Sequence, residues 1–443
     1  MTLPVLRWSE LSTRDRLLAL QRPVPSRAVN VAEDVARIVH DVRVHGDATL
    51  FALTEKFDGA TLSSLRVSQE EWDSAESEVS LDARDALAVA VANVRRFHEA
   101  QRFVPIEMET SPGVLCERIE RPLRAVGLYV PAGSAPLPSA AIMSAVPAQI
   151  MGCPVRVLCS PPHRNGRIHP AVLLVARMCG ITEVFKVGGA QAIAAMAYGT
   201  ATIPKVDKVF GPGNAWVTSA KQQVSQDPHG AALDLPAGPS EVLVIADHTA
   251  RADFVASDLL AQAEHDPRSH VVFVTTSHDL ALQVLQQLTT QLGQLSRREI
   301  AEQALKESRV IVVPDLQTAF DVSNSYAPEH LVVDVHNARS WLPAIREAGS
   351  VFLGPWTCEP LGDYCSGTNH VLPTYGYARA YSGLSLDDFG RRITVQEASA
   401  EGLRTLGPTA HTLAMLEGLD AHARAVSIRL DALQSGREHA GQT

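Results

Sequence analysis

The middle of the chain repeats one pattern, and this repetition constrains the fold more than any other feature. In each repeat, a short β-branched run is followed by a glycine turn and then by an alanine-rich amphipathic stretch. The expected strands of the first set are 155–159, 183–187 and 208–210, and the helices that follow them are 170–179, 189–198 and 214–224. Such strand–turn–helix units predict a parallel sheet with helices on both faces.

A second set of units follows the first. Its expected strands are 241–245, 271–275 and 310–313, and its expected helices are 249–266 and 280–292. The two ends of the chain carry helical periodicity instead, at 31–44, 83–97, 394–403 and from His411 onward. At 443 residues the chain exceeds the size at which a single hydrophobic core stops growing, so more than one domain is expected.

The predicted fold class is therefore α/β. We expect two Rossmann-like parallel-sheet domains, incomplete and atypical, with helical N- and C-terminal extensions. The expected boundaries are a helical extension over 1–28, a first α/β domain formed by 29–128 with 240–384, a second α/β domain over 129–239, and a helical tail over 385–443.

Composition narrows the class of protein further. Hydrophobic residues make up 46% of the chain and charged residues 20%, as in ordinary globular proteins, and the formal charge of −10 argues against a nucleic-acid partner. The sequence contains neither a signal-peptide pattern nor an apolar run of membrane-spanning length. Six cysteines without short metal-binding spacings favour reduced thiols. We therefore expect a cytoplasmic protein with no membrane partner.

Two glycine turns suggest a nucleotide cofactor. Gly188-Gly189 and the segment 211–214 each separate an expected strand from an expected helix, where backbone N–H groups can hold a pyrophosphate. Neither turn has the full G-x-G-x-x-G pattern, and the strand that ends at Cys159 lacks the usual ribose-binding acid. Glycines needed only for tight turns are the alternative explanation.

A candidate metal site lies at the end of the expected helix 249–266. Gln262 and His265 are three residues apart and share a helix face, and Pro267 stops the helix beyond them. An amide oxygen and an imidazole suit zinc, with manganese or cobalt as other possibilities, if a carboxylate and a second histidine complete the site. The alternative is a solvated polar helix end.

Three further segments carry acid, base or ligand groups. Glu329-His330 opens an apolar run and is a candidate general base with its carboxylate neighbour, or else a surface pair. The polar loop 358–374 contains two carboxylates and a histidine; its Cys365 is assigned to packing because a nearby carboxylate disfavours a thiolate. Glu417 and His422 could converge across a helix break at Gly418, although an exposed histidine is the usual outcome.

Together these motifs resemble the histidinol dehydrogenase family. The segments that carry the resemblance cover nearly the whole chain in order: 127–131, 187–192, 210–214, 234–241, 261–266, 327–330 and 362–374. The resemblance implies NAD-dependent oxidation of histidinol to histidine through a bound aldehyde, the last two steps of histidine biosynthesis. The choice of NAD over NADP rests on this resemblance alone.

The resemblance also implies roles for individual residues. Zinc would be held by Gln262, His265, Asp363 and His422, and NAD would contact Tyr129, Gln191 and Asn214. The substrate would be bound by Ser240, His330, Glu359, His370 and Glu417 together with the zinc ligands. His330 would accept the alcohol proton and Glu329 would activate water. The first α/β domain would carry the metal and catalytic residues, the second would bind NAD, and the C-terminal tail would form a homodimer with shared active sites.

Three positions depart from the family pattern. Cys365, Ala132 and Leu361 stand where we expect alanine, glycine and a small residue, which puts packing and affinity in doubt rather than activity.

Three other functions compete with this one. They are a related dehydrogenase for another polar alcohol, a zinc hydrolase that uses Glu329, and a non-catalytic binding module. Glu359, His370 and Glu417 argue against the first, and the glycine turns with Tyr129 argue against the second.

Overall fold

A computed structural model describes residues 3–23, 28–132, 136–236 and 238–434. Contacts divide the chain into two compact units. The first unit comprises Met1–Gln101 and Leu123–Phe389, and the second comprises Arg102–Pro122 and Gly390–Thr443. Two parallel sheets with flanking helices form the first unit, which confirms the predicted α/β class.

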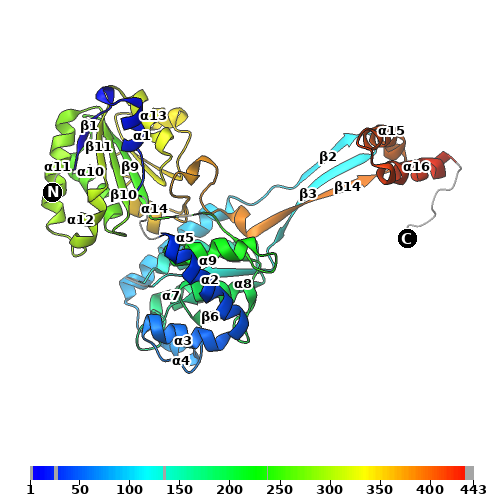
Figure 1. The fold of residues 1–443 in the computed structure, drawn as a ribbon, viewed down its shortest axis with the longest axis horizontal. Helices are drawn as coiled ribbons and strands as arrows, with labels where there is room; N and C mark the ends of the chain where they lie inside the picture. The colour runs from blue at the N-terminus through cyan, green and yellow to red at the C-terminus, as the bar shows by residue number, and fades with distance from the viewer. Residues whose placement is uncertain (1–2, 24–27, 133–135, 237, 435–443) are drawn as a thin grey trace. The chain divides into compact units, whose positions relative to one another are not determined.

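The first sheet of this unit has six strands in the order β1-β11-β10-β9-β12-β13, and all neighbours are parallel. Its strands are β1 (Val5–Arg7), β9 (Glu241–Ala246), β10 (His270–Thr275), β11 (Arg309–Val312), β12 (His330–Asp334) and β13 (Ser350–Leu353). Every residue of β9, β10 and β12 is buried, as expected for a parallel sheet covered on both faces. One face packs on α10 (Ala252–Ala263), α11 (His278–Leu292) and α12 (Arg298–Lys306), and the other on α13 (Leu316–Tyr326) (Figure 1).

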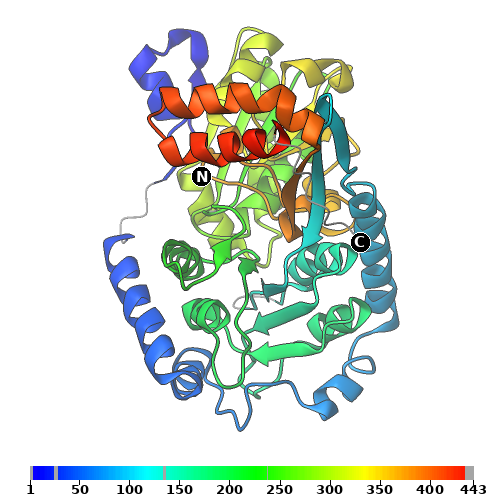
Figure 2. The ribbon, with the colours of Figure 1, turned by 90° about the vertical axis from the view of Figure 1, so that its right-hand side faces the viewer.

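The second sheet has five parallel strands in the order β6-β5-β4-β7-β8 (Figure 2). Its strands are β4 (Ala125–Tyr129), β5 (Val155–Ser160), β6 (Glu183–Lys186), β7 (Lys208–Phe210) and β8 (Ala232–Leu233). Helices α5 (Leu81–Glu99), α6 (Pro138–Met151) and α7 (Pro170–Met178) contribute to the core on one face. The core on the other face includes α2 (Ala28–His45), α3 (Asp47–Asp58), α8 (Gly189–Tyr198) and α9 (Ala215–Gln226).

The N-terminal region differs from the expected boundaries. We expected 29–128 to belong with 240–384, but α2, α3 and α5 pack against the five-stranded sheet, because the apolar stripe Val35, Val39 and Val42 of α2 enters its core. The extension 1–28 was expected to be helical. It contains α1 (Thr13–Ala19), but β1 is an edge strand paired with β11, and residues 24–27 lie outside the described part. A short helix, α4 (Gln69–Ser74), lies between α3 and α5 in the chain.

The second unit is an antiparallel ribbon that continues into two helices. The strands β2 (Ile106–Ser111), β3 (Val114–Pro122) and β14 (Gly390–Ala398) pair in the order β14-β3-β2. Helices α15 (Ala400–Leu416) and α16 (Asp420–Gln434) follow and lie side by side (Figure 2). The predicted helix 394–403 is therefore wrong over its first half. Ile393 and Val395 alternate with polar residues on a strand whose partner, β3, is distant in sequence.

The state of the cysteines and the lengths of the apolar helices test two further expectations. All six cysteines are free, which agrees with the expected reduced thiols. Cys153, Cys159 and Cys179 are buried, and Cys116 and Cys358 are half-buried. Cys365 packs against the core below the five-stranded sheet, which confirms its assignment to packing. Within the described residues, no helix is both long and apolar enough to span a membrane.

Candidate active site

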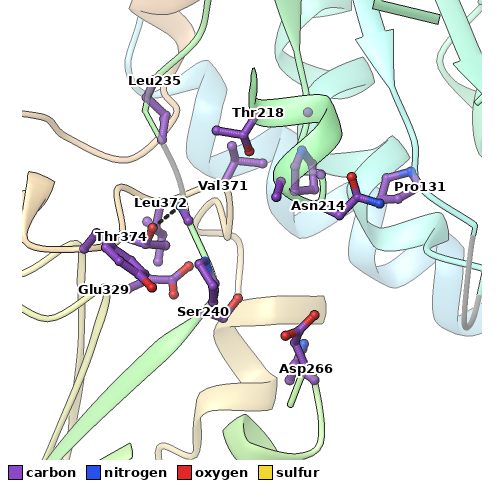
Figure 3. A pocket seen from close by; sticks show the side chains of 18 of the residues that line it. Pro131, Asn214, Thr218, Leu235, Ser240, Asp266, Glu329, Val371, Leu372 and Thr374 are labelled. Atoms are coloured by element: carbon purple, nitrogen blue, oxygen red, sulfur yellow. Dashed lines mark hydrogen bonds between the residues drawn. The ribbon is translucent and has the colours of Figure 1, made fainter. Parts of the chain in front are cut away.

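A cavity of about 650 Å³ in the first unit is lined by residues from both sheets. From the six-stranded sheet, Ser240 directly precedes β9, and Glu329 and His330 lie at the start of β12. From the five-stranded sheet, Pro131 follows β4 and Asn214 follows β7. Figure 3 shows Ser240 and Glu329 on one side of the cavity and Asn214 with Pro131 on the other. One sheet thus presents the amino ends of its strands, and the other presents the carboxyl ends.

The path of α10 explains how the candidate metal ligands reach this cavity. The helix follows the carboxyl end of β9 and runs back along the sheet, so its last turn lies at the amino ends of the strands. Gln262 is in that turn, and His265 lies just beyond the C-cap Glu264. The helix ends at Ala263, so the predicted extension to Asp266 is wrong. Both side chains nevertheless line the cavity, as their spacing predicted.

The imidazole of His330 is surrounded by carboxylates. Its Nδ1 lies 3.7 Å from Glu329 Oε2 and 4.0 Å from Glu359 Oε1, and its Nε2 lies 3.5 Å from Asp363 Oδ1. The side chains of His330, Glu329 and Glu359 are each at most 5% exposed. Glu329 is oriented by the backbone N–H of Glu241, which donates to its Oε2 at 2.8 Å. Glu329 and His330 are therefore a buried pair, not the surface pair that was the alternative.

Burial and charge act in opposite directions on these groups. Burial lowers the pKa of His330, but Glu359, Glu329 and Asp363 outweigh it and raise the pKa to about 10. Burial raises the pKa of Glu329 and that of Glu359 to about 8, although the charge of His330 opposes both rises. For Asp363, burial is outweighed by the hydrogen bond to His330 and its charge, which lower the pKa. The cluster therefore attracts positive charge.

Three side chains could hold a metal ion in this region. One ligand atom from each of His265, Glu359 and Asp363 lies within 4.8 Å of the others. Asp363 and Glu359 come from the short helix α14 (Glu359–Tyr364), and Glu359 Oε2 is buried without a hydrogen-bond partner in the described structure. The amide nitrogen of Gln262 satisfies its neighbours when it donates to Glu359 Oε1 at 3.2 Å and to the carbonyl of Glu241 at 3.1 Å. That orientation turns the amide oxygen of Gln262 away from these acceptors and leaves it available as a ligand.

His370 also lies on this wall of the cavity. Its Nδ1–H donates to the backbone carbonyl of Asp363 at 2.7 Å, so Nε2 is the acceptor of the neutral ring. Burial lowers the pKa of His370 more than the nearby charge of Asp363 raises it. His370 is thus a neutral hydrogen-bonding group beside an acidic cluster.

The opposite wall consists of backbone and polar groups at the ends of β7 and β8. Gly211 has φ +117°, and a Cβ there would lie 2.1 Å from the carbonyl oxygen of Tyr129, so only glycine fits. Asn214 caps α9, where its side-chain oxygen accepts from the N–H groups of Trp216 and Val217 at 3.0 and 3.3 Å.

A buried ion pair that the sequence did not reveal holds this turn. Lys221 and Asp234 are in contact, and their side chains are 8% and 1% exposed. Lys221 Nζ donates to the carbonyl of Gly211 at 3.0 Å, and Asp234 accepts from the N–H of Gly211 at 2.9 Å. Lys221 gives no signal in the sequence, because a single lysine on a helix usually faces solvent. Asp234 gives a weak one, because it follows the glycine turns closely in the chain.

The other two predicted cofactor residues lie beside the cavity and not in its lining. Tyr129 is 4% exposed, and its hydroxyl accepts from the N–H of Gly189 at 3.0 Å. Gln191 is 2% exposed in the first turn of α8. Tyr129 is the last residue of β4 and Gln191 is near the start of α8, so both lie at the carboxyl edge of the five-stranded sheet.

The last two predicted site residues belong to the second unit. Glu417 is the C-cap of α15 and His422 lies in the first turn of α16, and both are exposed. Gly418 separates the helices with φ +70°, so the helix break predicted at this glycine is present.

This cavity, with a buried imidazole–carboxylate pair on one wall and glycine turns at helix starts on the other, defines an α/β enzyme with an acid–base site. Comparisons with known proteins identify its family. The family model described as histidinol dehydrogenase matches residues 21–430. The chain therefore belongs to the histidinol dehydrogenase family, an oxidoreductase family by name, and the resemblance noted in the sequence is confirmed.

Individual relatives agree with this assignment. The chain is 55% identical over 428 residues to the histidinol dehydrogenase of Vibrio vulnificus (strain CMCP6), which covers 97% of this chain and 98% of the relative. It is also 55% identical over 430 residues to that of Vibrio cholerae serotype O1, with 97% and 99% covered. Among solved structures, histidinol dehydrogenase from Elizabethkingia anophelis matches with a TM-score of 0.93 at 45% identity, over 98% of this chain and 99% of that one.

Proposed function

We propose that the protein oxidises L-histidinol to L-histidine in two NAD-dependent steps, the last two of histidine biosynthesis, with L-histidinaldehyde kept in the cavity between them. The observation that carries this proposal is the buried pair Glu329–His330 on the cavity wall, beside the metal-ligating types His265 and Asp363. Membership of the family supports histidinol as the substrate. Six free thiols support a reducing, cytoplasmic compartment.

Gln262, His265 and Asp363 would hold a zinc ion, with His422 as the fourth ligand. The mixed nitrogen and oxygen donors suit zinc, and Glu359 Oε2 is buried with no hydrogen-bond partner among the described residues, which supports a cation in this region. When bound, zinc supplies a charge that holds the amine and imidazole of histidinol. Charge neutralisation at Asp363 would also lower the pKa of His330 and leave that ring neutral, as a base requires.

Tyr129, Gln191 and Asn214 would hold NAD along the carboxyl edge of the five-stranded sheet. Support comes from the strand order, in which β4 is central with β5 and β6 on one side and β7 and β8 on the other, as in dinucleotide-binding halves. When bound, each NAD would supply the acceptor for one hydride, so two NAD molecules in succession would take up the two hydrides that leave the substrate carbon.

The acid–base work falls to two residues. His330 takes the proton of the alcohol as the first hydride leaves, which yields the aldehyde. Glu329 then takes a proton from water, the water oxygen adds to the aldehyde carbon, and the protonated His330 returns its proton to the former carbonyl oxygen, which gives the hydrate and leaves His330 neutral again. Burial raises the pKa of Glu329 to about 8, so its ionised form is a stronger base than an ordinary carboxylate. His330 takes a proton of the hydrate as the second hydride leaves.

The polar ends of histidinol would be bound by Ser240, Glu359, His370 and Glu417. Glu359 is buried with a free oxygen, which suits a cationic amine, and Nε2 of His370 can accept a hydrogen bond from the substrate. Oriented contacts of this kind keep the aldehyde in place between the two oxidations.

Glu417 and His422 would come from a second copy of the chain in a homodimer. Support comes from the large apolar side chains that surround them and are exposed in the single chain: Leu413, Leu416, Leu419 and Ile428. Patches of this kind mark protein interfaces. A mixture of His330→Ala and His422→Ala, each inactive alone, should regain activity, because a mixed dimer has one intact site. A mixture that stays inactive, although subunits exchange, would contradict shared sites.

The reaction itself is tested by its stoichiometry. The protein, loaded with zinc, is supplied with limiting L-histidinol and excess NAD, and NADH is followed by absorbance while products are separated by chromatography. We expect two NADH and one histidine per histidinol. Turnover of another polar alcohol without histidinol oxidation would instead establish the related dehydrogenase, and amide cleavage without NADH would establish the hydrolase.

A further inference from the structure

The carboxyl edge of the five-stranded sheet has a second polar region, beyond β4 from the turn that carries Asn214. Here β5 ends at Ser160, next to β6, and α3 packs against α8. Asp58 is the last residue of α3. The next residue, Gly59, lies beside the loop that follows β5, because a Cβ on it would be 3.8 Å from Cγ of Arg164. Burial raises the pKa of the Tyr129 hydroxyl to about 12, and the charge of Asp58 adds to this rise.

Several polar atoms of this region lack partners. Ser160 Oγ, Thr54 Oγ1 and Asp58 Oδ2 are buried and make no hydrogen bond to any described residue. Ser160 and Thr54 are both 0% exposed. Thr54 and Asp58 are four residues apart on α3, so they share its inward face. Buried polar groups are normally satisfied, so the unpartnered carboxylate oxygen of Asp58 is open to a polar ligand.

The strand order tells which part of the ligand would lie here. With β4 as the first strand of a dinucleotide-binding half, β5 is the second, and the end of the second strand normally carries the acid that binds the adenosine ribose. In this chain that position is Ser160, so the acid is missing from β5. Asp58 reaches the same edge from a different element. The distance from β7 to β5 is two strand spacings, about 10 Å, which an extended dinucleotide can span.

We propose that Asp58 binds the ribose hydroxyls of the adenosine half of the cofactor and makes the site select NAD over NADP. This inference rests on the proposed NAD-dependent function. A carboxylate accepts hydrogen bonds from both ribose hydroxyls, whereas the 2′-phosphate of NADP would bring negative charge against it. The selectivity would thus come from an N-terminal helix and not from the sheet.

The test compares Asp58→Asn with the matched variant Glu55→Gln, which removes an exposed carboxylate from the same helix. Binding of NAD, NADP and ADP-ribose to the zinc-loaded protein is measured by calorimetry, and thermal unfolding shows whether each variant is folded. For Asp58→Asn we expect binding of NAD and ADP-ribose that is weaker by about tenfold to hundredfold, since the lost hydrogen bonds are made to a charged group. We also expect tighter binding of NADP.

The outcomes separate the two proposals. Unchanged NAD affinity and unchanged preference over NADP in folded Asp58→Asn would overturn the role of Asp58 while leaving the dehydrogenase intact. Absence of NAD binding and of NADH formation in the unmodified protein would overturn both. Asp58→Glu, which keeps the charge, should retain the preference for NAD; if Asp58→Asn is unfolded, loss of that preference in Asp58→Glu would contradict the proposal.

Discussion

The six-stranded and five-stranded sheets of the first unit face the cavity with opposite ends of their strands. The six-stranded sheet contributes charged side chains at its amino edge, including His330 and Glu329. The five-stranded sheet contributes glycine turns and a helix cap at its carboxyl edge, including Gly211 and Asn214. Ligands of open α/β sheets usually bind at the carboxyl edge, so only the second sheet follows the common rule.

Helix dipoles explain why the carboxyl edge of one sheet suits anions and the amino edge of the other suits cations. A helix that follows a parallel strand begins at the carboxyl edge and ends at the amino edge. The carboxyl edge of the five-stranded sheet therefore collects the positive N-termini of α8 and α9, which suit phosphates. The amino edge of the six-stranded sheet receives the negative C-terminus of α10, which suits a cation. One cavity thus combines a wall that suits anions with a wall that suits a cation.

The strongest test of this comparison uses the two ends of β12. His330→Ala removes the proposed base at the amino end, so we expect kcat to fall by about 10²–10⁴-fold while the zinc content is retained. His336→Ala removes an exposed histidine just beyond the carboxyl end of the strand and should leave kcat unchanged. Steady-state kinetics and metal analysis provide the measurements. Full turnover by His330→Ala would refute its role as base.

A backbone test addresses the wall from the five-stranded sheet. Gly211→Ala should lower the free energy of unfolding by roughly 3 kcal/mol, because the new methyl meets the carbonyl of Tyr129 in a backbone conformation reserved for glycine. It should also raise the KM for NAD. Gly152→Ala has a similar positive φ, but its Cβ would meet nothing within 4 Å, so it should cost less and leave KM unchanged. Chemical denaturation measures both; equal losses would show that Gly211 is needed only for its backbone angle.

The smallest expected effect concerns pH. His270, at the amino end of β10, is buried with its ring between Tyr326 and the carbonyl of Glu307, and burial lowers its pKa to about 4. The unfolded chain takes up a proton near pH 6.5, so stability is lost as pH falls from there towards the folded pKa. The loss is about 2 kcal/mol between pH 7 and about pH 5. Denaturation of His270→Gln should lack this part of the pH dependence; an unchanged slope would assign it to other groups.

Much of the candidate site could be predicted because several of its residues are close together in the sequence, where secondary structure alone fixes their relative positions. The interval between Gln262 and His265 placed both on one helix face, and the neighbours Glu329 and His330 necessarily reach the same strand start. Lys221 and Asp234 could not be paired in advance, since nothing local joins a helix residue to a loop beyond it. The same reason explains why periodicity predicts a helix from residue 394 where the structure has the end of β14, whose partner β3 is distant in sequence.

The sequence by itself determined the α/β class, the two sets of strands, the glycine turns and the adjacent placement of Glu329 and His330. Each of these follows from residue type and periodicity over a few positions. Only the tertiary structure decided that α2, α3 and α5 pack against the five-stranded sheet, and that the two sheets meet the cavity with opposite edges. It also placed the end of α3, where Asp58 lies, beside the loop that follows β5, the strand that lacks the acid. Those results depend on contacts between residues far apart in the chain, which periodicity does not encode.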